Sequence, residues 1–86
     1  MFEWEVLTRD GCSLCEAFVA ELAEALGPAR AAEVRVVDVD ADPTLKRKYG
    51  HRVPVLRIDG EFVCDYRLDH ERLAPYLQAV GDRPAP

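Results

Sequence analysis

The feature that most constrains this chain is a pair of cysteines, Cys12 and Cys15, at the point where a strand pattern gives way to a helix pattern. The alternating run Trp4–Leu7 predicts a strand before the pair, and apolar residues every four positions predict a helix after it. A cysteine at a helix N-terminus meets unpaired backbone N–H groups and the positive end of the helix dipole, which favour the thiolate. The second sulfur lies about one turn further along, close enough for a disulfide. The sequence therefore predicts a dithiol redox site.

The length and composition limit the number of domains and the classes of partner that this chain can have. The 86 residues make one domain, which we place at residues 1–80 with a flexible tail at 81–86. The formal charge of -5 argues against nucleic-acid binding, which rests on neutralising phosphates. No apolar run approaches the roughly 18 residues of a membrane span, and charges at Glu3, Glu5 and Arg9 interrupt any signal peptide. We therefore expect a cytoplasmic monomer that binds neither nucleic acid nor membrane.

The number of cysteines limits the chemistry of the pair. Three is an odd number and too few for a secreted disulfide scaffold, and a reducing cytosol does not sustain a lasting disulfide. The pair is therefore either catalytic or part of a metal site. A structural zinc site needs two further ligands, and the remaining candidates, Cys64, His51 and His70, make no second close pair. We favour redox chemistry with no metal, and a redox-inert module stays open as an alternative.

Helix and strand signals alternate along the rest of the chain. We expect strands over residues 3–8, 34–40, 53–58 and 61–65, and helices over residues 12–26, 42–50 and 69–80. Gly27 and Pro28 end the first helix, and Asp59 and Gly60 form the turn of a hairpin. The order is β-α-β-α-β-β-α. Because a crossover helix joins parallel strands, we expect an α/β fold with a four-stranded mixed sheet flanked by helices.

The later elements carry more specific expectations. The strand over residues 34–40 is rich in β-branched residues and should be buried on at least one face, and residues 29–33 before it form a short connection. Asp42 and Asp69 are expected to cap the second and third helices, and Pro75 predicts a kink or a late start in the last one. The inward-facing residues of these helices are expected to be Leu45, Tyr49, Leu73, Tyr76, Leu77 and Val80.

Four motifs, in this order along the chain, resemble the small glutaredoxin-like proteins of the thioredoxin superfamily. They are Arg9-x-Gly11-Cys12-x-x-Cys15, the run Val36–Asp40, the dipeptide Val53-Pro54 and the Asp59-Gly60 hairpin. The resemblance covers nearly the whole chain and implies a thioredoxin-like fold. It implies that Cys12 is the nucleophile, that Cys15 is the resolving cysteine, and that Pro54, after Val53, is a cis-proline that pairs with substrate backbone. It implies no bound cofactor, and glutathione is a candidate reductant.

The chain departs from this family at three places. A Gly-Gly pair after the fourth strand, which gives glutathione access to the backbone, is replaced by the segment Val63–Tyr66. Ser13 and Leu14 replace the Pro-Tyr that usually separates the cysteines, and Arg52 replaces a common Thr before Val-Pro. Side chains at positions 64 and 65 would occupy space that glutathione needs. These departures argue against the family's usual mode of glutathione binding, whereas the cysteine pair itself matches the family.

Residues close to the pair are predicted to influence it. Arg9 favours the Cys12 thiolate through its charge, whereas the carboxylate of Asp10 opposes it. Leu14, between the cysteines, offers an apolar contact to a substrate. Cys64 is interpreted either as core filler, because cysteine is among the most buried residue types, or as a third redox-active thiol.

A basic cluster interrupts an otherwise acidic sequence. It comprises Lys46, Arg47, Lys48, His51 and Arg52. Its ordinary interpretation is a solvated helix face. If Pro54 packs beside the cysteines, however, His51 and Arg52 lie near the site, where they would bind a carboxylate of glutathione or of an acidic protein substrate.

The function that best fits these observations is thiol-disulfide exchange, in which Cys12 attacks a substrate disulfide and Cys15 resolves the mixed disulfide. The expected substrates are disulfide-containing proteins or glutathione. The expected electron donors are glutathione or a thioredoxin-reductase-type partner. Two alternatives stay open: a redox-inert thioredoxin-like adaptor, and a metal or iron–sulfur carrier that uses Cys12 and Cys15, with or without Cys64.

Overall fold

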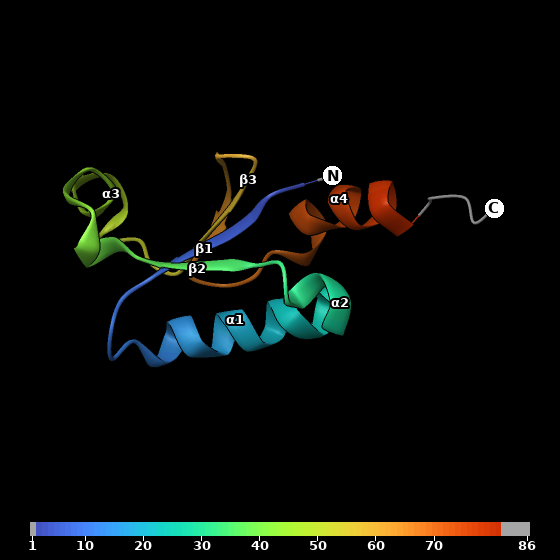
Figure 1. The fold of residues 1–86 in the computed structure, drawn as a ribbon, viewed down its shortest axis with the longest axis horizontal. Coiled ribbons are helices and arrows are strands. Elements are labelled where there is room, and N and C mark those ends of the chain that lie inside the picture. The colour runs from blue at the N-terminus through green and yellow to red at the C-terminus, as the bar shows by residue number, and fades with distance from the viewer. Residues whose placement is uncertain (1, 82–86) are drawn as a thin grey trace.

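A four-stranded mixed sheet forms the centre of the molecule in a computed structural model, which describes residues 2–81 (Figure 1). Its strands are β1 (Trp4–Thr8), β2 (Arg35–Asp38), β3 (Val55–Ile58) and β4 (Glu61–Asp65). The helices are α1 (Ser13–Leu26), α2 (Pro28–Ala31), α3 (Pro43–Tyr49) and α4 (His70–Gly81), and a 3-10 turn, η1, covers Val39–Ala41. This is the predicted α/β fold, with α2 and η1 as additions.

The strands lie side by side in the order β2-β1-β3-β4. β2 runs parallel to β1, with Val36 opposite Val6, because α1 and α2 carry the chain back across the sheet between them. β3 runs antiparallel to β1 and pairs with β4. The turn residues Asp59 and Gly60 have φ angles of 54° and 82°. These left-handed values are the ones that a two-residue turn requires, so the predicted hairpin is confirmed.

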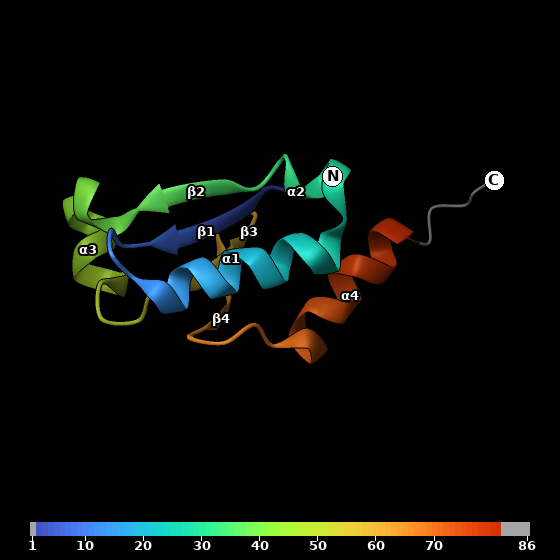
Figure 2. The ribbon, with the colours of Figure 1, turned by 90° about the horizontal axis from the view of Figure 1, so that it is seen from below.

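The sheet separates two layers of buried side chains. Successive residues of a strand point to opposite faces, and in β1 Val6 belongs to one layer and Leu7 to the other. The larger core, between the sheet, α1 and α4, contains Trp4, Val6, Phe18, Leu22, Leu26, Leu56, Ile58, Val63, Cys64, Leu68 and Leu73. The smaller core, beneath α3, contains Leu7, Val39, Tyr49 and Val55. Figure 2 shows α1 running across its face of the sheet, with β2 to one side and β4 to the other.

The first helix begins and ends as predicted. Cys12 is the N-cap of α1, with extended backbone angles (φ −99°, ψ 100°). Gly27 ends the helix at φ 86° and ψ 162°, a region that is essentially confined to glycine. Residues 29–33, expected as a plain connection, instead contain most of α2. Pro28 starts this short helix because its fixed φ suits a first helical position.

The second strand is shorter and more exposed than predicted. β2 ends at Asp38, whose carboxylate accepts a hydrogen bond from the Asp40 N–H (2.9 Å) and turns the chain into η1. None of the four residues of β2 is buried, and Val36 is 55% exposed. The expectation of a strand buried on one face is therefore met only in part: Val37 is half-buried against the smaller core, and the other residues of β2 are exposed. β2 is an edge strand, and the buried Val39 belongs to η1.

Both later helices are capped by the predicted aspartates. Asp42 accepts hydrogen bonds from two N–H groups in the first turn of α3 (2.9 and 3.3 Å). Asp69 does the same for α4 (both 3.1 Å). α4 begins at His70 and contains Pro75, so the start of this helix is not delayed. β3 begins at Val55, two residues later than predicted.

The predicted inward faces of α3 and α4 are confirmed where the structure describes them. The buried members are Tyr49 and Leu73, and the half-buried ones are Leu45, Tyr76 and Leu77. The side chain of Val80 and residues 82–86 of the predicted tail lie outside the described part of the chain. Within residues 2–81, no helix is both long enough and apolar enough to cross a membrane.

Candidate functional site

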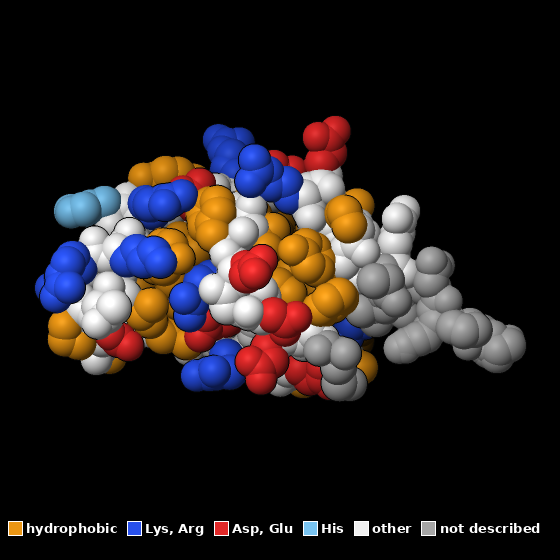
Figure 3. Space-filling view, turned by 90° about the horizontal axis from the view of Figure 1, so that it is seen from above, with side chains coloured by type: hydrophobic (Ala, Val, Ile, Leu, Met, Phe, Trp, Pro, Cys, Tyr) orange, Lys and Arg blue, Asp and Glu red, His pale blue; other side chains and the backbone are white. Residues whose placement is uncertain are grey.

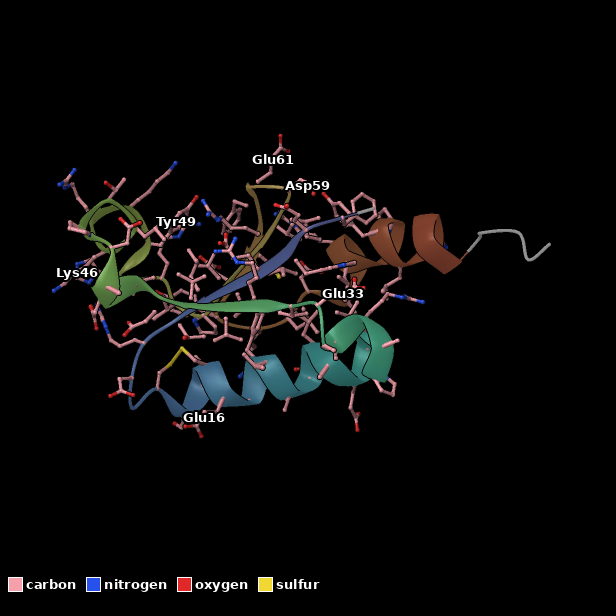
Figure 4. All side chains as sticks on the ribbon, in the orientation of Figure 1. Glu16, Glu33, Lys46, Tyr49, Asp59 and Glu61 are labelled. Atoms are coloured by element: carbon pink, nitrogen blue, oxygen red, sulfur yellow. A yellow bond between two sulfur atoms is a disulfide. The ribbon has the colours of Figure 1, made fainter. Side chains whose placement is uncertain are left out.

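The cysteine pair lies where β1 passes into α1, at one end of the molecule (Figure 4). Cys12 and Cys15 form a disulfide, and their Cα atoms are 5.2 Å apart. The connecting loop turns at Gly11, whose φ is 74°, and the Cys12 N–H donates to the carbonyl of Arg9 (3.2 Å). The Cys15 N–H donates to Cys12 Sγ (3.0 Å). An N–H of the first helical turn therefore points at the sulfur that the sequence predicts to be the nucleophile.

The two cysteines differ in their exposure to solvent. Cys15 lies on the buried face of α1 and is 2% exposed, whereas Cys12, at the N-cap, is only half-buried. Leu14, between them, is 45% exposed. Cys12 is therefore the more solvent-accessible of the two cysteines.

Arg9 is held by a carboxylate from η1. Its Nε and Nη2 each lie 3.0 Å from an oxygen of Asp40, and Lys46 Nζ lies 3.8 Å from the same carboxylate. The hydrogen bond from Arg9, helped by the charges of Arg9 and Lys46, lowers the pKa of Asp40 below its usual value. The Arg9 charge is therefore shared with Asp40, although the Arg9 side chain still borders a cavity beside Cys12.

Two cavities flank the N-terminal half of α1. The first, of about 360 Å³, lies between α1 and the β1–β2 edge, and its lining residues are Thr8, Arg9, Cys12, Cys15, Glu16, Val19, Ala20 and Val36. The second, of about 270 Å³, lies between α1 and the segment after β4, and its lining residues are Leu14, Ala17, Phe18, Glu21, Tyr66, Arg67 and Leu68. The cysteines border the first cavity, and the residue between them borders the second.

Val53 and Pro54 lie at the end of the sheet from which the cysteine loop departs. Leu7 pairs with Val55 in the register of β1 and β3, which brings Pro54 beside the end of β1. The Val53–Pro54 peptide bond is cis, and Pro54 is fully buried. Val53 is half-buried against the smaller core.

His51 and Arg52 are tied to the end of β4. Arg52 Nε lies 2.9 Å from Asp65 Oδ2, and its guanidinium lies 4.5 Å from the centre of the Phe62 ring. His51 is exposed, and its carbonyl accepts a hydrogen bond from the Tyr66 hydroxyl (2.6 Å). Neither His51 nor Arg52 lines either of the two cavities beside α1.

Tyr66 is a residue of this region that sequence reasoning does not single out. Its φ of 62° is unusual for an aromatic residue. Its N–H donates to the Pro54 carbonyl (2.9 Å), its hydroxyl donates to the His51 carbonyl, and Tyr66 lines the second cavity together with Leu14. Tyr66 therefore joins the Pro54 loop to the surface beside α1. The only signal in the sequence is its place in the segment that replaces the family's glycines.

The third cysteine is separate from the disulfide. Cys64 is 5% exposed within the larger core, and burial raises the pKa of its thiol. Its position fits the interpretation as core filler. Across residues 2–81, no three His, Cys, Asp or Glu side chains are grouped so that they could hold a metal ion.

The fold and the cysteine pair together define a small thioredoxin-like protein with two cysteines at the start of its first helix. A family model described as "Glutaredoxin-like domain (DUF836)" matches residues 4–78. The chain therefore belongs to the glutaredoxin-like family, as its motifs predict.

Relatives from several bacteria share this fold or sequence. "Uncharacterized protein Rv0508" of Mycobacterium tuberculosis is 34% identical over 74 residues, which cover 80% of this chain and 75% of the relative. The solution NMR structure of protein Ne2328 from Nitrosomonas europaea has a TM-score of 0.75 and 34% identity, over 87% of this chain and 89% of the other. The X-ray structure of protein XcR50 from X. campestris has a TM-score of 0.56 and 36% identity, over 88% and 96% of the two chains.

Proposed function

We propose that this protein is a cytoplasmic thiol-disulfide oxidoreductase. The observation that carries the proposal is the Cys12–Cys15 disulfide at the N-terminus of α1, in which the more exposed sulfur accepts the Cys15 N–H. Membership of the glutaredoxin-like family supports the same chemistry. The proposed substrates are proteins that contain a disulfide.

Cys12 supplies the attacking thiolate in the reduced protein. The free N–H groups at the start of α1 and the dipole of the helix stabilise negative charge on its sulfur. The sulfur bonds to one sulfur of the substrate disulfide, and the other substrate sulfur leaves as a thiolate and takes a proton from water. The product of this step is a mixed disulfide between Cys12 and the substrate.

Cys15 completes the reaction. It loses its proton to solvent and attacks the Cys12 sulfur, which forms the intramolecular disulfide and releases the second substrate thiol. Two electrons have then passed from the dithiol to the substrate. Two glutathione molecules, which become glutathione disulfide, or a thioredoxin-reductase-type partner would return them, so the protein needs no bound cofactor.

Residues around the cysteines are proposed to hold the substrate. They are Arg9, Leu14, His51, Arg52, Val53 and Pro54. The family resemblance assigns Val53 and Pro54 to contact with substrate backbone, and the exposed Leu14 offers an apolar contact at the second cavity. Because Arg52 already pairs with Asp65, a substrate carboxylate at Arg52 would compete with that ion pair.

Glutathione docking would depend on the end of β4. Cys64 lies in the larger core, so its side chain does not fill exposed space there. Asp65 is held by Arg52, and Tyr66 is 48% exposed and bonded to the Pro54 loop. The groups that a docked glutathione would meet are therefore the Asp65 carboxylate and the Tyr66 ring.

Equilibration in glutathione redox buffers tests the proposal. The Cys64→Ala variant leaves Cys12 and Cys15 as the only thiols, and alkylation followed by intact-mass measurement counts how many remain reduced. We expect both thiols to disappear together and reversibly, with a midpoint between about −200 and −270 mV, the span of glutaredoxins and thioredoxin. A mass increase of one glutathione on Cys12 would show that glutathione docks.

Two cysteine variants check the assigned order of attack. Cys15→Ser should accumulate a mixed disulfide at Cys12, and Cys12→Ser should not react. If the two thiols stayed reduced at every potential, the oxidoreductase proposal would fail in favour of the adaptor. Stoichiometric metal or a visible absorption band in anaerobically purified protein would instead support the carrier.

A further inference from the structure

Positive charge is concentrated in one segment of this acidic chain. Residues 43–58 contain five Lys or Arg side chains and no Asp or Glu, whereas the whole chain has a formal charge of -5. The five are Lys46, Arg47, Lys48, Arg52 and Arg57. The positive charges of this segment are therefore set apart from the carboxylates of the rest of the chain, which the net charge alone does not show.

The fold places most of this charge on one exposed surface. We call it the α3 basic face, and it comprises Lys46, Arg47, Lys48, His51 and Arg52, all of which are exposed. Lys46 pairs with Asp40 and Arg52 with Asp65. Within residues 2–81, Arg47 and Lys48 have no carboxylate within ion-pair distance, so their charges are uncompensated. Figure 3 shows Lys and Arg side chains gathered at the end of the molecule that carries α3.

This surface begins beside the cysteine loop. Arg9, three residues before Cys12, shares the Asp40 carboxylate with Lys46. A Cβ placed on Gly50, just after α3, would lie 3.3 Å from the Arg9 guanidinium, so the end of α3 contacts the Arg9 side chain. Figure 1 shows α3 at the same end of the molecule as the loop between β1 and α1, and Figure 4 shows the disulfide at that end.

We propose that the α3 basic face docks an acidic surface of the protein whose disulfide reacts at Cys12. This inference rests on the proposed function and names the partner class for it. A patch of like charge beside a reactive group attracts an oppositely charged partner and raises the rate of encounter in a salt-dependent way. Arg47 and Lys48 are the residues that carry this attraction, because their charges are not already paired.

A protein partner fits the charge distribution better than a nucleic acid or a membrane does. Binding to an extended polyanion rests on neutralising many phosphates. Here the basic face is limited to one short helix and the loop after it, and the remainder of the chain carries enough carboxylates to bring the total to -5. A small acidic patch around a substrate disulfide would be attracted by the α3 basic face. It would not extend to the carboxylates elsewhere on the chain, which would repel a longer polyanion.

Rates of reaction with charged peptides test this inference. The reduced protein is mixed with short peptides that contain one disulfide flanked by Glu, by Gln or by Lys, and oxidation of the Cys12–Cys15 dithiol is followed by stopped flow. At about 20 mM salt we expect the Glu peptide to react about tenfold faster than the Gln peptide and the Lys peptide to react more slowly. At about 500 mM salt the three rates should converge, because the charges are then screened.

Two variants of equal charge locate the effect. Arg47→Glu with Lys48→Glu reverses the uncompensated pair, and Arg30→Glu with Arg35→Glu makes the same change in net charge in α2 and β2. We expect the first variant to lose the preference for the Glu peptide and the second to keep most of it. Since new carboxylates near the end of α3 oppose the helix dipole, the pair Arg47→Gln and Lys48→Gln provides a milder version. It should reduce the preference without reversing it.

The outcomes separate this inference from the proposed function. If no peptide is reduced at any salt concentration, the oxidoreductase proposal itself fails. If all peptides are reduced at equal rates, or if both Glu variants lose the preference equally, exchange occurs and the docking inference is overturned. Binding of a fluorescent single-stranded oligonucleotide by the basic face more tightly than the Glu peptide would also overturn it.

Discussion

At the scale of single residues, Tyr66 connects two parts of the candidate site that are distant in sequence. Its hydroxyl donates to the carbonyl of His51 and its N–H to the carbonyl of Pro54. Tyr66→Phe removes the first of these bonds and keeps the ring. Because a partly exposed hydrogen bond contributes modestly, we expect a loss of about 0.5–1 kcal/mol in the free energy of unfolding, measured by urea titration.

Tyr76→Phe is the matched control for this change. It also removes one hydroxyl, but its ring packs edge-on against Phe2, 5.2 Å between centres, away from the Pro54 loop. Reaction of Cys12 with a peptide disulfide should slow in Tyr66→Phe and stay unchanged in Tyr76→Phe. Equal effects of the two variants would mean that Tyr66 does not position the Pro54 loop.

Asp40 gives a second prediction at the residue scale, and this one depends on pH. Its pKa in the folded protein is lowered, chiefly by the hydrogen bond from Arg9. Because the folded-state pKa is lowered, the ionised carboxylate stabilises the fold at pH values above the unfolded-state pKa of about 3.8–3.9. This stabilisation is lost as the pH falls through the folded-state pKa. Asp40→Asn should therefore be less stable than the parent at pH 7, and the difference should shrink as the pH is lowered through the folded-state pKa of Asp40.

The measurement is the free energy of unfolding of parent and variant across this pH range. Asp10→Asn, which removes an exposed carboxylate from the neighbouring loop, is the control and should follow the parent. A difference between Asp40→Asn and the parent that stayed constant down to about pH 2 would show that the ionised pair with Arg9 is not its source.

At the scale of elements, the joint between α1 and α2 depends on Gly27. Its backbone, at φ 86° and ψ 162°, lies in a region that costs other residues about 1–3 kcal/mol. A Cβ added at Gly27 would meet no atom within 4 Å, so the cost is conformational and not a clash. We therefore expect Gly27→Ala to lower the free energy of unfolding by about 1–3 kcal/mol. Glu24→Ala, on the exposed side of α1, should change it little.

Elements whose signals are local are the ones that the sequence predicts well. The N-cap at Cys12, the caps at Asp42 and Asp69, and the Asp59-Gly60 turn each depend on residues within one turn of the chain. They form as expected. The cysteine pair is predictable for the same reason, because a spacing of three residues at a helix start fixes its geometry without help from the rest of the fold.

Features that depend on the whole sheet are not predictable in this way. The run Val34–Asp40 predicts a strand buried on at least one face, yet β2 lies at the sheet edge, and of its four residues only Val37 is half-buried. The partners of the site are likewise remote in sequence. Asp40 lies 31 residues from Arg9, and Tyr66 lies 15 from His51. Asp40 reaches Arg9 because β2 pairs in parallel with β1. Tyr66 reaches His51 because the segment after β4 returns to the loop before β3.

At the scale of the whole molecule, the two faces of the sheet are unequally supported. The larger core joins the sheet to α1 and α4, whereas α3 rests on the four buried residues of the smaller core. The disulfide belongs to the start of α1, on the well-packed side, and the α3 basic face belongs to the weaker side. The molecule therefore holds its reactive sulfurs on the more firmly packed layer and its proposed docking charges on the less firmly packed one.

This inequality predicts that α3 opens before the sheet does. Regions with few buried apolar contacts unfold locally at a lower free energy than the core. Native-state hydrogen exchange should therefore give amides of α3, such as the Gly50 N–H that donates to Lys46, a lower opening free energy than amides of β1 and β3. Leu45→Ala, which truncates a half-buried contact of the smaller core, should lower the α3 value further, by about 1–2 kcal/mol.

Leu77→Ala is the matched control, because Leu77 is a half-buried leucine packed against the larger core. It should lower the stability of the whole protein while leaving the local opening of α3 unchanged. If α3 and β1 amides exchanged with the same free energy, the two cores would form one cooperative unit. In that case a partner docked on the α3 basic face would meet a rigid surface, and its binding would stabilise the entire domain. If α3 opens first, the same partner would selectively slow exchange in α3, because it binds only the closed form of that helix.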